Sequence, residues 1–151
     1  MNTLRMPRKV FDEMRAHGEQ TYPDECCGAL LCRPTAEGWQ LVKAVRAANA
    51  RTDAAHHRYE IAPAELVRME REARDQRLEI GGFYHSHPDH PAQWSATDLG
   101  EAHWLGCAYV ITEVARGRAA ATNAFLLAGN IEEDKRFEPL AIRVEDEDGV
   151  E

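Results

Sequence analysis

The chain has 151 residues, 44% of them hydrophobic and 29% charged, which is the composition of a single globular domain with one core. Its formal net charge of −8 argues against a nucleic-acid partner, which needs a clustered basic surface. No apolar run approaches the roughly 20 residues of a membrane span, and the N-terminal residues lack the apolar core of a signal peptide. We therefore expect a cytoplasmic protein without a nucleic-acid or membrane partner.

The acids and the cysteines are unevenly distributed along the chain. Residues 145–151 contain five acids and no base, so we expect one folded domain over residues 1–144 followed by a solvated, disordered acidic tail over 145–151. All four cysteines lie in apolar segments, and none belongs to a Cys-x-x-Cys pair. We interpret them as reduced, buried thiols and not as disulfides or zinc ligands. They are Cys26, Cys27, Cys32 and Cys107.

The N-terminal part of the chain predicts a helix followed by a hairpin. Residues 7–21 begin with a proline suited to a first turn and carry apolar side chains at helical spacing. His17, on this helix, is interpreted as an ordinary surface or boundary histidine. The run from Glu25 to Cys32 is continuously apolar after Glu25, which predicts a strand buried on both faces. Residues 39–48 alternate loosely and predict the second strand of the hairpin.

The middle of the chain predicts a short strand and a charged helix. We expect the third strand over residues 57–61. His56 and His57 would point to opposite faces of an extended chain, so they are not expected to share a metal ion. Residues 63–77 predict a helix that begins with a proline, and its alternating charges are typical of a solvated helix face.

The C-terminal half predicts four strands and one more helix. Residues 79–87 predict a strand in which Gly81-Gly82 indicates weak packing or the close approach of another backbone. A helix is expected from Ser95 to about Trp104. The resulting order, α-β-β-β-α-β-α-β-β-β, predicts a single α/β domain with a mixed, mostly antiparallel sheet flanked by helices. The last three strands are expected over 107–114, over 121–128 and around 140–144.

Two histidines at the end of one strand form a candidate metal site. His85 and His87 are two residues apart, so their side chains share a face with backbones roughly 6.5–7 Å apart. Asp98 follows after a loop long enough to bring it back, which completes a three-ligand site with an open fourth position, as in catalytic zinc. Taken alone, Ser95 to Asp98 is equally typical of a helix cap. Glu25, at the mouth of a buried strand, is either a turn residue or a group that reaches into the site.

The combined pattern Glu … His-Ser-His-x7-Ser-x2-Asp resembles the signature of the JAMM (MPN+) zinc metalloproteases. Glu25-Cys26-Cys27-Gly28 is similar to the Glu-x-x-Gly of the first strand in that family, and the motif is most similar to small stand-alone bacterial (Mec-like) members. The resemblance implies a cytidine-deaminase-like (MPN) α/β fold. Trp94 departs from the smaller or proline-like residue expected before the serine, and the chain is too short for the insertions of ubiquitin-chain-specific relatives.

The resemblance also implies a role for each residue of the motif. His85, His87 and Asp98 would bind Zn²⁺, which lowers the pKa of a water molecule. Glu25 would be the general base that then protonates the leaving amine. Ser95 would donate a hydrogen bond to the oxyanion. The implied reaction is hydrolysis of a peptide or isopeptide bond.

The implied substrate is a ubiquitin-fold sulfur-carrier protein of the ThiS/MoaD type. Small relatives release an amino acid such as cysteine, or a short extension, from the C-terminal Gly-Gly tail of such a carrier. Alternatives are a deubiquitinase-like isopeptidase acting on protein conjugates and a non-proteolytic MPN scaffold, which the filled motif positions disfavour. A structural zinc site would need a fourth ligand. A nucleotide deaminase would need His-x-Glu and Pro-Cys-x-x-Cys, and neither is present.

Overall fold

The computed structural model describes residues 3–51, 55 and 58–146 of the chain. The strands are β1 (Thr3–Pro7), β2 (Cys27–Thr35), β3 (Gly38–Ala47), β4 (Glu79–Pro88), β5 (Ala108–Ala115), β6 (Arg118–Ala128) and β7 (Arg136–Glu145). The helices are α1 (Arg8–Thr21), α2 (Pro63–Asp75) and α3 (Ala96–Glu101), with a short 3-10 turn, η1 (Glu132–Asp134).

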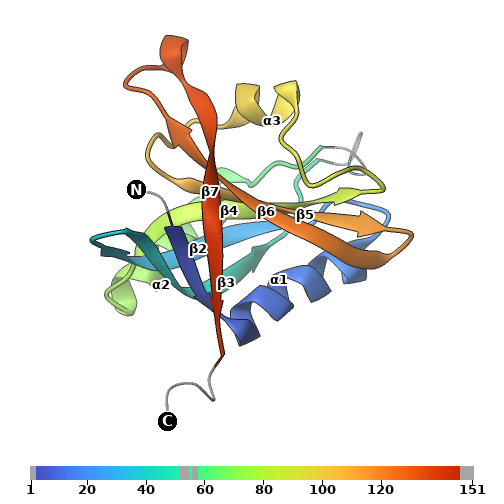
Figure 1. The fold of residues 1–151 in the computed structure, drawn as a ribbon, viewed down its shortest axis with the longest axis horizontal. Helices are drawn as coiled ribbons and strands as arrows, with labels where there is room; N and C mark the ends of the chain where they lie inside the picture. The colour runs from blue at the N-terminus through green and yellow to red at the C-terminus, as the bar shows by residue number, and fades with distance from the viewer. Residues whose placement is uncertain (1–2, 52–54, 56–57, 147–151) are drawn as a thin grey trace.

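The strands form one closed, mixed sheet in the order β1-β3-β2-β4-β5-β6-β7. Four neighbouring pairs are antiparallel, namely β2·β3, β2·β4, β5·β6 and β6·β7. The pairs β1·β3, β1·β7 and β4·β5 are parallel. The predicted α/β class with a mixed sheet and flanking helices is confirmed at this level. In Figure 1, α1 runs below the strands and α3 lies above them.

Closure of the sheet depends on β1, a strand that the sequence did not indicate. β1 lies between β3 and β7 and pairs in parallel with both. Its two inward side chains, Leu4 and Met6, are completely buried. Five residues with two apolar side chains give almost no periodic signal, because the stability of such a strand comes from partners far away in sequence.

Two other expectations about local structure need correction. The strand expected over 57–61 is absent from its described part, residues 58–61, and His56 and His57 lie outside the described residues. The helix expected from Ser95 to about Trp104 ends earlier, at Glu101. It contains Gly100, a residue that lowers helix stability.

The start of the expected acidic tail belongs to the fold. β7 extends through Glu145, which accepts a 2.9 Å hydrogen bond from Nε of Arg5 in β1. The next residue, Asp146, accepts one of 2.8 Å from Nε of Arg8. Residues 147–151 lie outside the described part of the chain.

Strand alternation sorts the buried side chains into two main clusters. One contains Val10 and Met14 of α1 together with Tyr84 of β4. The other contains Met69 of α2 together with Phe83 of β4. All four cysteines are buried, as predicted, and none is bridged to another in the structure. Within the described residues, none of the helices combines the length and apolar character that crossing a membrane requires.

His17 is part of this packing and is not a surface residue as expected. Its side chain is 6% exposed, and Nδ1 lies 2.8 Å from the hydroxyl oxygen of Tyr84. Helical spacing places His17 one turn beyond Met14, on the face of α1 that packs against the sheet. Burial, with a smaller contribution from the charge of Arg46, lowers the pKa of His17 to about 4. The imidazole is therefore a neutral hydrogen-bonding group of the core.

β4 lies at the centre of the sheet, between β2 and β5. A Cβ atom on Gly82 would lie 1.9 Å from the carbonyl oxygen of Ala108, so only glycine allows the two parallel strands to approach here. This confirms the predicted close approach of another backbone. The close pairing on both sides fixes the end of β4, which carries the two candidate ligands.

Candidate active site

His85 and His87 project from the same face at the C-terminal end of β4. Both are buried, with 2% and 7% of their surface exposed, and their Nε2 atoms are 3.2 Å apart. Ser86, between them, points to the other face and accepts a 2.8 Å hydrogen bond from the backbone N–H of Cys26. Side chains two residues apart in a strand share a face, as predicted from the sequence, and this brings the two imidazoles together.

The carboxylate of Asp98 completes this group. Its Oδ1 lies 3.3 Å from Nε2 of His85, and its Oδ2 lies 3.1 Å from Nε2 of His87. The ligand atoms of the three residues all lie within 4.8 Å of one another, so the group could hold a metal ion. Two imidazole nitrogens and one carboxylate are a donor set that suits zinc.

The helix cap and the metal-binding geometry use the same residues. The backbone N–H of Asp98 donates to Oγ of Ser95 over 3.0 Å, and the N–H of Ser95 donates to Oδ2 of Asp98 over 2.9 Å. This capping box begins α3 and also orients the carboxylate towards the histidines. The two interpretations of the Ser-Ala-Thr-Asp stretch are therefore compatible.

Contacts outside the group orient the two imidazoles. Nδ1 of His87 lies 2.8 Å from the carbonyl oxygen of Pro91. A carbonyl only accepts, so Nδ1 carries the proton and the lone pair of Nε2 points towards Asp98 and His85. The ring of Tyr59 stacks on that of His85, with centroids 4.5 Å apart and an interplanar angle of 25°. Nδ1 of His85 has no hydrogen-bond partner among the described residues.

The electrostatics of the group favour a bound cation. Burial lowers the pKa of His85, which keeps this imidazole neutral. For His87, burial acts in the same direction but is outweighed by the bonds to Asp98 and Pro91, which raise its pKa. Burial alone would raise the pKa of Asp98, but its contacts with both histidines hold that pKa well below its usual range. The carboxylate is therefore ionised, and it lies against both imidazoles.

Glu25 reaches this region through the pairing of β2 with β4. Cys27 pairs with His85 in the antiparallel register. Glu25, two residues before Cys27, therefore lies on the side of His87, two residues after His85. The Glu25 side chain is 4% exposed, and its Oε1 has no hydrogen-bond partner among the described residues. Burial raises the pKa of Glu25 to about 8, with smaller contributions from Asp98 and Glu101, while His87 acts against the shift. Glu25 is therefore placed in the site and is not a turn residue.

One cavity connects the predicted residues. It has a volume of about 620 Å³ and is lined by Glu25, Arg58, His87, His90, Pro91, Gln93, Ser95, Thr97 and Asp98. A neighbouring apolar cavity of about 310 Å³ includes Tyr59, Phe83, Trp104 and Tyr109. Tyr59 separates this apolar cavity from His85, on which it stacks. Four of the five predicted site residues thus line one hollow, and His85 contacts two of these four.

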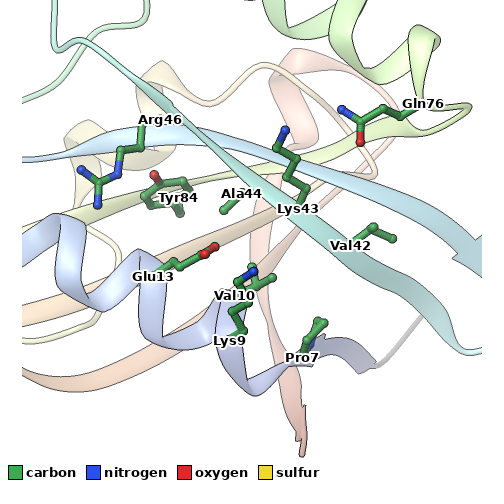
Figure 2. A pocket seen from close by; sticks show the side chains of 10 residues that line it. All are labelled: Pro7, Lys9, Val10, Glu13, Val42, Lys43, Ala44, Arg46, Gln76 and Tyr84. Atoms are coloured by element: carbon green, nitrogen blue, oxygen red, sulfur yellow. The ribbon is translucent and has the colours of Figure 1, made fainter. Parts of the chain in front are cut away.

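A third hollow, of about 650 Å³, contains none of the predicted site residues. Figure 2 shows it between α1 and β3, with Lys9 and Glu13 on the helix and Arg46 on the strand, while the Lys43 side chain points away from the helix. Lys43 forms a 2.6 Å ion pair with Glu72, and Arg46 donates a 2.7 Å hydrogen bond to Gln20. Two of its cations, Lys43 and Arg46, therefore already have partners, and the candidate chemistry lies in the hollow that contains Glu25.

The sequence did not indicate three residues that complete the site. Arg58 lines the cavity, Tyr59 stacks on His85, and Pro91 accepts the hydrogen bond of His87. Arg58 and Tyr59 follow a run of mostly polar residues in the sequence, so no periodicity marks them. Contacts of the folded chain, such as the stacking of Tyr59 on His85, bring them to the site.

The fold and the His85–His87–Asp98 group define a small α/β domain with a group that could hold a metal ion. The family model described as prokaryotic homologs of the JAB domain matches residues 7–142, and the chain belongs to this family. The JAB/MPN family includes hydrolases.

Solved structures resemble the whole domain. A solution structure of a protein from Salinibacter ruber is 36% identical, with a TM-score of 0.69, and the match covers 91% of this chain and 90% of that chain. A solution structure of a protein from Desulfitobacterium hafniense is 24% identical, with a TM-score of 0.77 over 96% of each chain. At 24% identity, the likeness to the Desulfitobacterium hafniense protein shows only that the two share a fold. A search of the curated proteins found no significant match.

Proposed function

We propose that the protein is a zinc-dependent peptide or isopeptide hydrolase. The observation that carries this proposal is the position of Glu25. Glu25 is buried, Oε1 of its carboxylate has no hydrogen-bond partner among the described residues, and it lines the same cavity as His87 and Asp98. A buried acid without a partner destabilises a fold, and such groups occur chiefly where chemistry requires them. A purely structural or scaffolding domain leaves this feature of Glu25 unexplained.

Each residue of the site has a defined task in this proposal. His85, His87 and Asp98 would hold the ion. A zinc ion bound there supplies Lewis acidity and lowers the pKa of a water molecule. Glu25 would take a proton from that water and later transfer it to the leaving amine, because its side chain lines the same cavity as the ligand group.

Ser95 can stabilise the developing oxyanion. Its Oγ accepts the N–H of Asp98 as a helix cap, which leaves the hydroxyl hydrogen free to donate into the cavity. The same contact fixes the position of the oxygen relative to Asp98. Capping therefore pre-organises the donor.

The substrate that we propose is the C-terminal tail of a ubiquitin-fold sulfur-carrier protein. The enzyme would remove an amino acid or a short extension, for example a cysteine, behind the Gly-Gly end. The cavity is a hollow on the surface of the domain, and glycine residues let an extended tail approach the ligand group closely. The reaction would free the Gly-Gly terminus of the carrier.

Substitution of Glu25 tests the catalytic assignment. Zinc-loaded wild-type protein should shorten a carrier that ends in Gly-Gly-Cys by one residue, as measured by mass spectrometry. Glu25→Gln should retain zinc but lose about 10²- to 10⁴-fold in rate, because the general base is gone. Glu133→Gln, at an exposed residue of η1, is the matched control and should behave as wild type. An unchanged carrier mass with the zinc-loaded wild type would contradict the proposed substrate. A normal rate in Glu25→Gln would contradict the base assignment.

A further inference from the structure

Arg58 is a cation placed inside the candidate active site. It lines the same cavity as Glu25, His87 and Ser95. Among the described residues around this cavity, it is the one arginine or lysine. The acidic side chains there are those of Glu25 and Asp98. An arginine beside the candidate metal-binding group therefore suggests a role in binding.

The side chain of Asn49 holds the backbone of Arg58 in a fixed relation to that of Glu25. Its Nδ2 donates to the carbonyl oxygen of Arg58 over 3.0 Å and to that of Glu25 over 3.4 Å. Its Oδ1 accepts the backbone N–H of Glu60 over 3.0 Å. One amide group therefore connects the residue before β2 to the segment that carries the arginine. The position of Arg58 is coupled to that of the proposed base.

The guanidinium of Arg58 is only partly satisfied. It donates a 3.0 Å hydrogen bond to Oε2 of Glu101, in an ion pair whose side chains are 36% and 46% exposed. Its Nε is buried and has no partner among the described residues. Exposed ion pairs are weak, so Glu101 orients the guanidinium without occupying all its donors. Arginine presents its N–H groups as a planar fork that matches a carboxylate.

We propose that Arg58 binds the α-carboxylate of the C-terminal residue that the enzyme releases. This inference rests on the proposed hydrolase function and deepens it, because it makes the protein an exopeptidase of the carboxypeptidase type. A terminal carboxylate in this cavity needs a donor that matches its two oxygens, and Arg58 is the one arginine or lysine among the described lining residues. A substrate that continues past the cleaved bond has only neutral backbone at this point and does not need Arg58.

Matched peptides test this assignment with the full zinc-loaded chain. One labelled peptide ends in Gly-Gly-Ala with a free carboxylate, and the other carries the same sequence as a C-terminal amide. Wild type should favour the free acid by about tenfold or more in kcat/KM, since one tenfold step corresponds to about 1.4 kcal/mol. Arg58→Gln should lower kcat/KM for the free-acid peptide to the value for the amide peptide. It should leave kcat/KM for the amide peptide nearly unchanged. Arg58→Lys should keep part of the preference, and Arg118→Gln, at an exposed residue of β6, should keep all of it.

A binding measurement separates this inference from the proposed activity. Fluorescence anisotropy with Glu25→Gln and with the double variant Glu25→Gln/Arg58→Gln measures the affinity for both peptides without turnover. The acid should bind about tenfold or more tighter than the amide, and only when Arg58 is present. If this holds while wild type cleaves neither peptide, Arg58 binds carboxylates and the hydrolase proposal fails. Equal affinity for acid and amide, or a preference that survives Arg58→Gln, overturns the role of Arg58.

Discussion

The two faces of β4 carry buried polar groups in opposite states. On the face towards α1, the Tyr84 hydroxyl bonds to His17 over 2.8 Å, and Oγ of Ser86 bonds to the N–H of Cys26 over 2.8 Å. On the other face, Nδ1 of His85 lacks a hydrogen-bond partner among the described residues, and so does Oε1 of the neighbouring Glu25. The same strand thus has one satisfied face and one with unused bonding capacity.

One face of β4 therefore belongs to the core, and the opposite face carries the candidate site. A buried polar pair that satisfies itself contributes to the specificity of the core. Buried polar groups without hydrogen-bond partners destabilise the fold unless a bound ligand satisfies them. His17 and His85 are both buried histidines with a lowered pKa, so burial alone does not distinguish them. Their hydrogen-bond partners do.

The largest expected effect is the loss of metal from the unsatisfied face. His85→Ala and His87→Ala should each reduce zinc from about one ion per chain to a trace, because two ligands do not make a stable site. Hydrolysis should disappear with the metal. The measurement is elemental analysis after dialysis. His17→Gln is the matched histidine variant on the satisfied face and should keep its zinc. Zinc lost equally from all three variants would mean that the two faces do not differ.

Ser95→Ala should have the next largest effect, because it removes a proposed oxyanion donor. The expected loss is about 10²- to 10³-fold in kcat, with about 1 kcal/mol of stability from the lost helix cap. Steady-state kinetics and urea unfolding measure the two effects separately. Ser95→Thr keeps both the hydroxyl and the cap, so it should recover most of the rate. If Ser95→Ala loses stability but no rate, Ser95 is a cap only.

Tyr84→Phe tests the satisfied face. The variant leaves Nδ1 of His17 buried without its partner, which should lower the free energy of unfolding by about 1–3 kcal/mol. Zinc content should not change. Tyr22→Phe is the control, because the Tyr22 hydroxyl bonds to the exposed Asp89 and its loss should cost little. Urea unfolding measures the free energy of unfolding of both variants. Equal losses would mean that burial does not make the Tyr84–His17 bond more important than the exposed Tyr22–Asp89 bond.

The same face of β4 should also carry a pH dependence through His17. Its pKa is about 4 in the folded protein and about 6.5 unfolded, so the unfolded chain binds the proton first as pH falls. The stabilisation by neutral His17 is therefore complete above pH 6.5 and is lost between pH 6.5 and about 4. Urea unfolding of wild type and His17→Gln across this range should show a steeper fall for wild type. Parallel curves would mean that His17 does not titrate as an isolated buried group.

Local regularities made most of the elements and the ligand group predictable. The two-residue period of a strand brings His85 and His87 together, and the Ser95 to Asp98 spacing forms a capping box that also presents the carboxylate. The expected roles of these residues in catalysis and metal binding remain predictions. β1 was missed because five residues contain little periodicity, although its pairing with β3 and β7 closes the sheet.

The sequence by itself determined the class of fold, the grouping of His85, His87 and Asp98, and the helix cap, because strand alternation and capping depend on residues a few positions apart. Tertiary structure decided which buried histidine has a partner and which does not. It also placed Glu25 beside His87 through the register of β2 on β4, and Arg58 in the cavity through Asn49. These placements depend on burial and pairing between segments that are distant in the chain, and no local spacing encodes them.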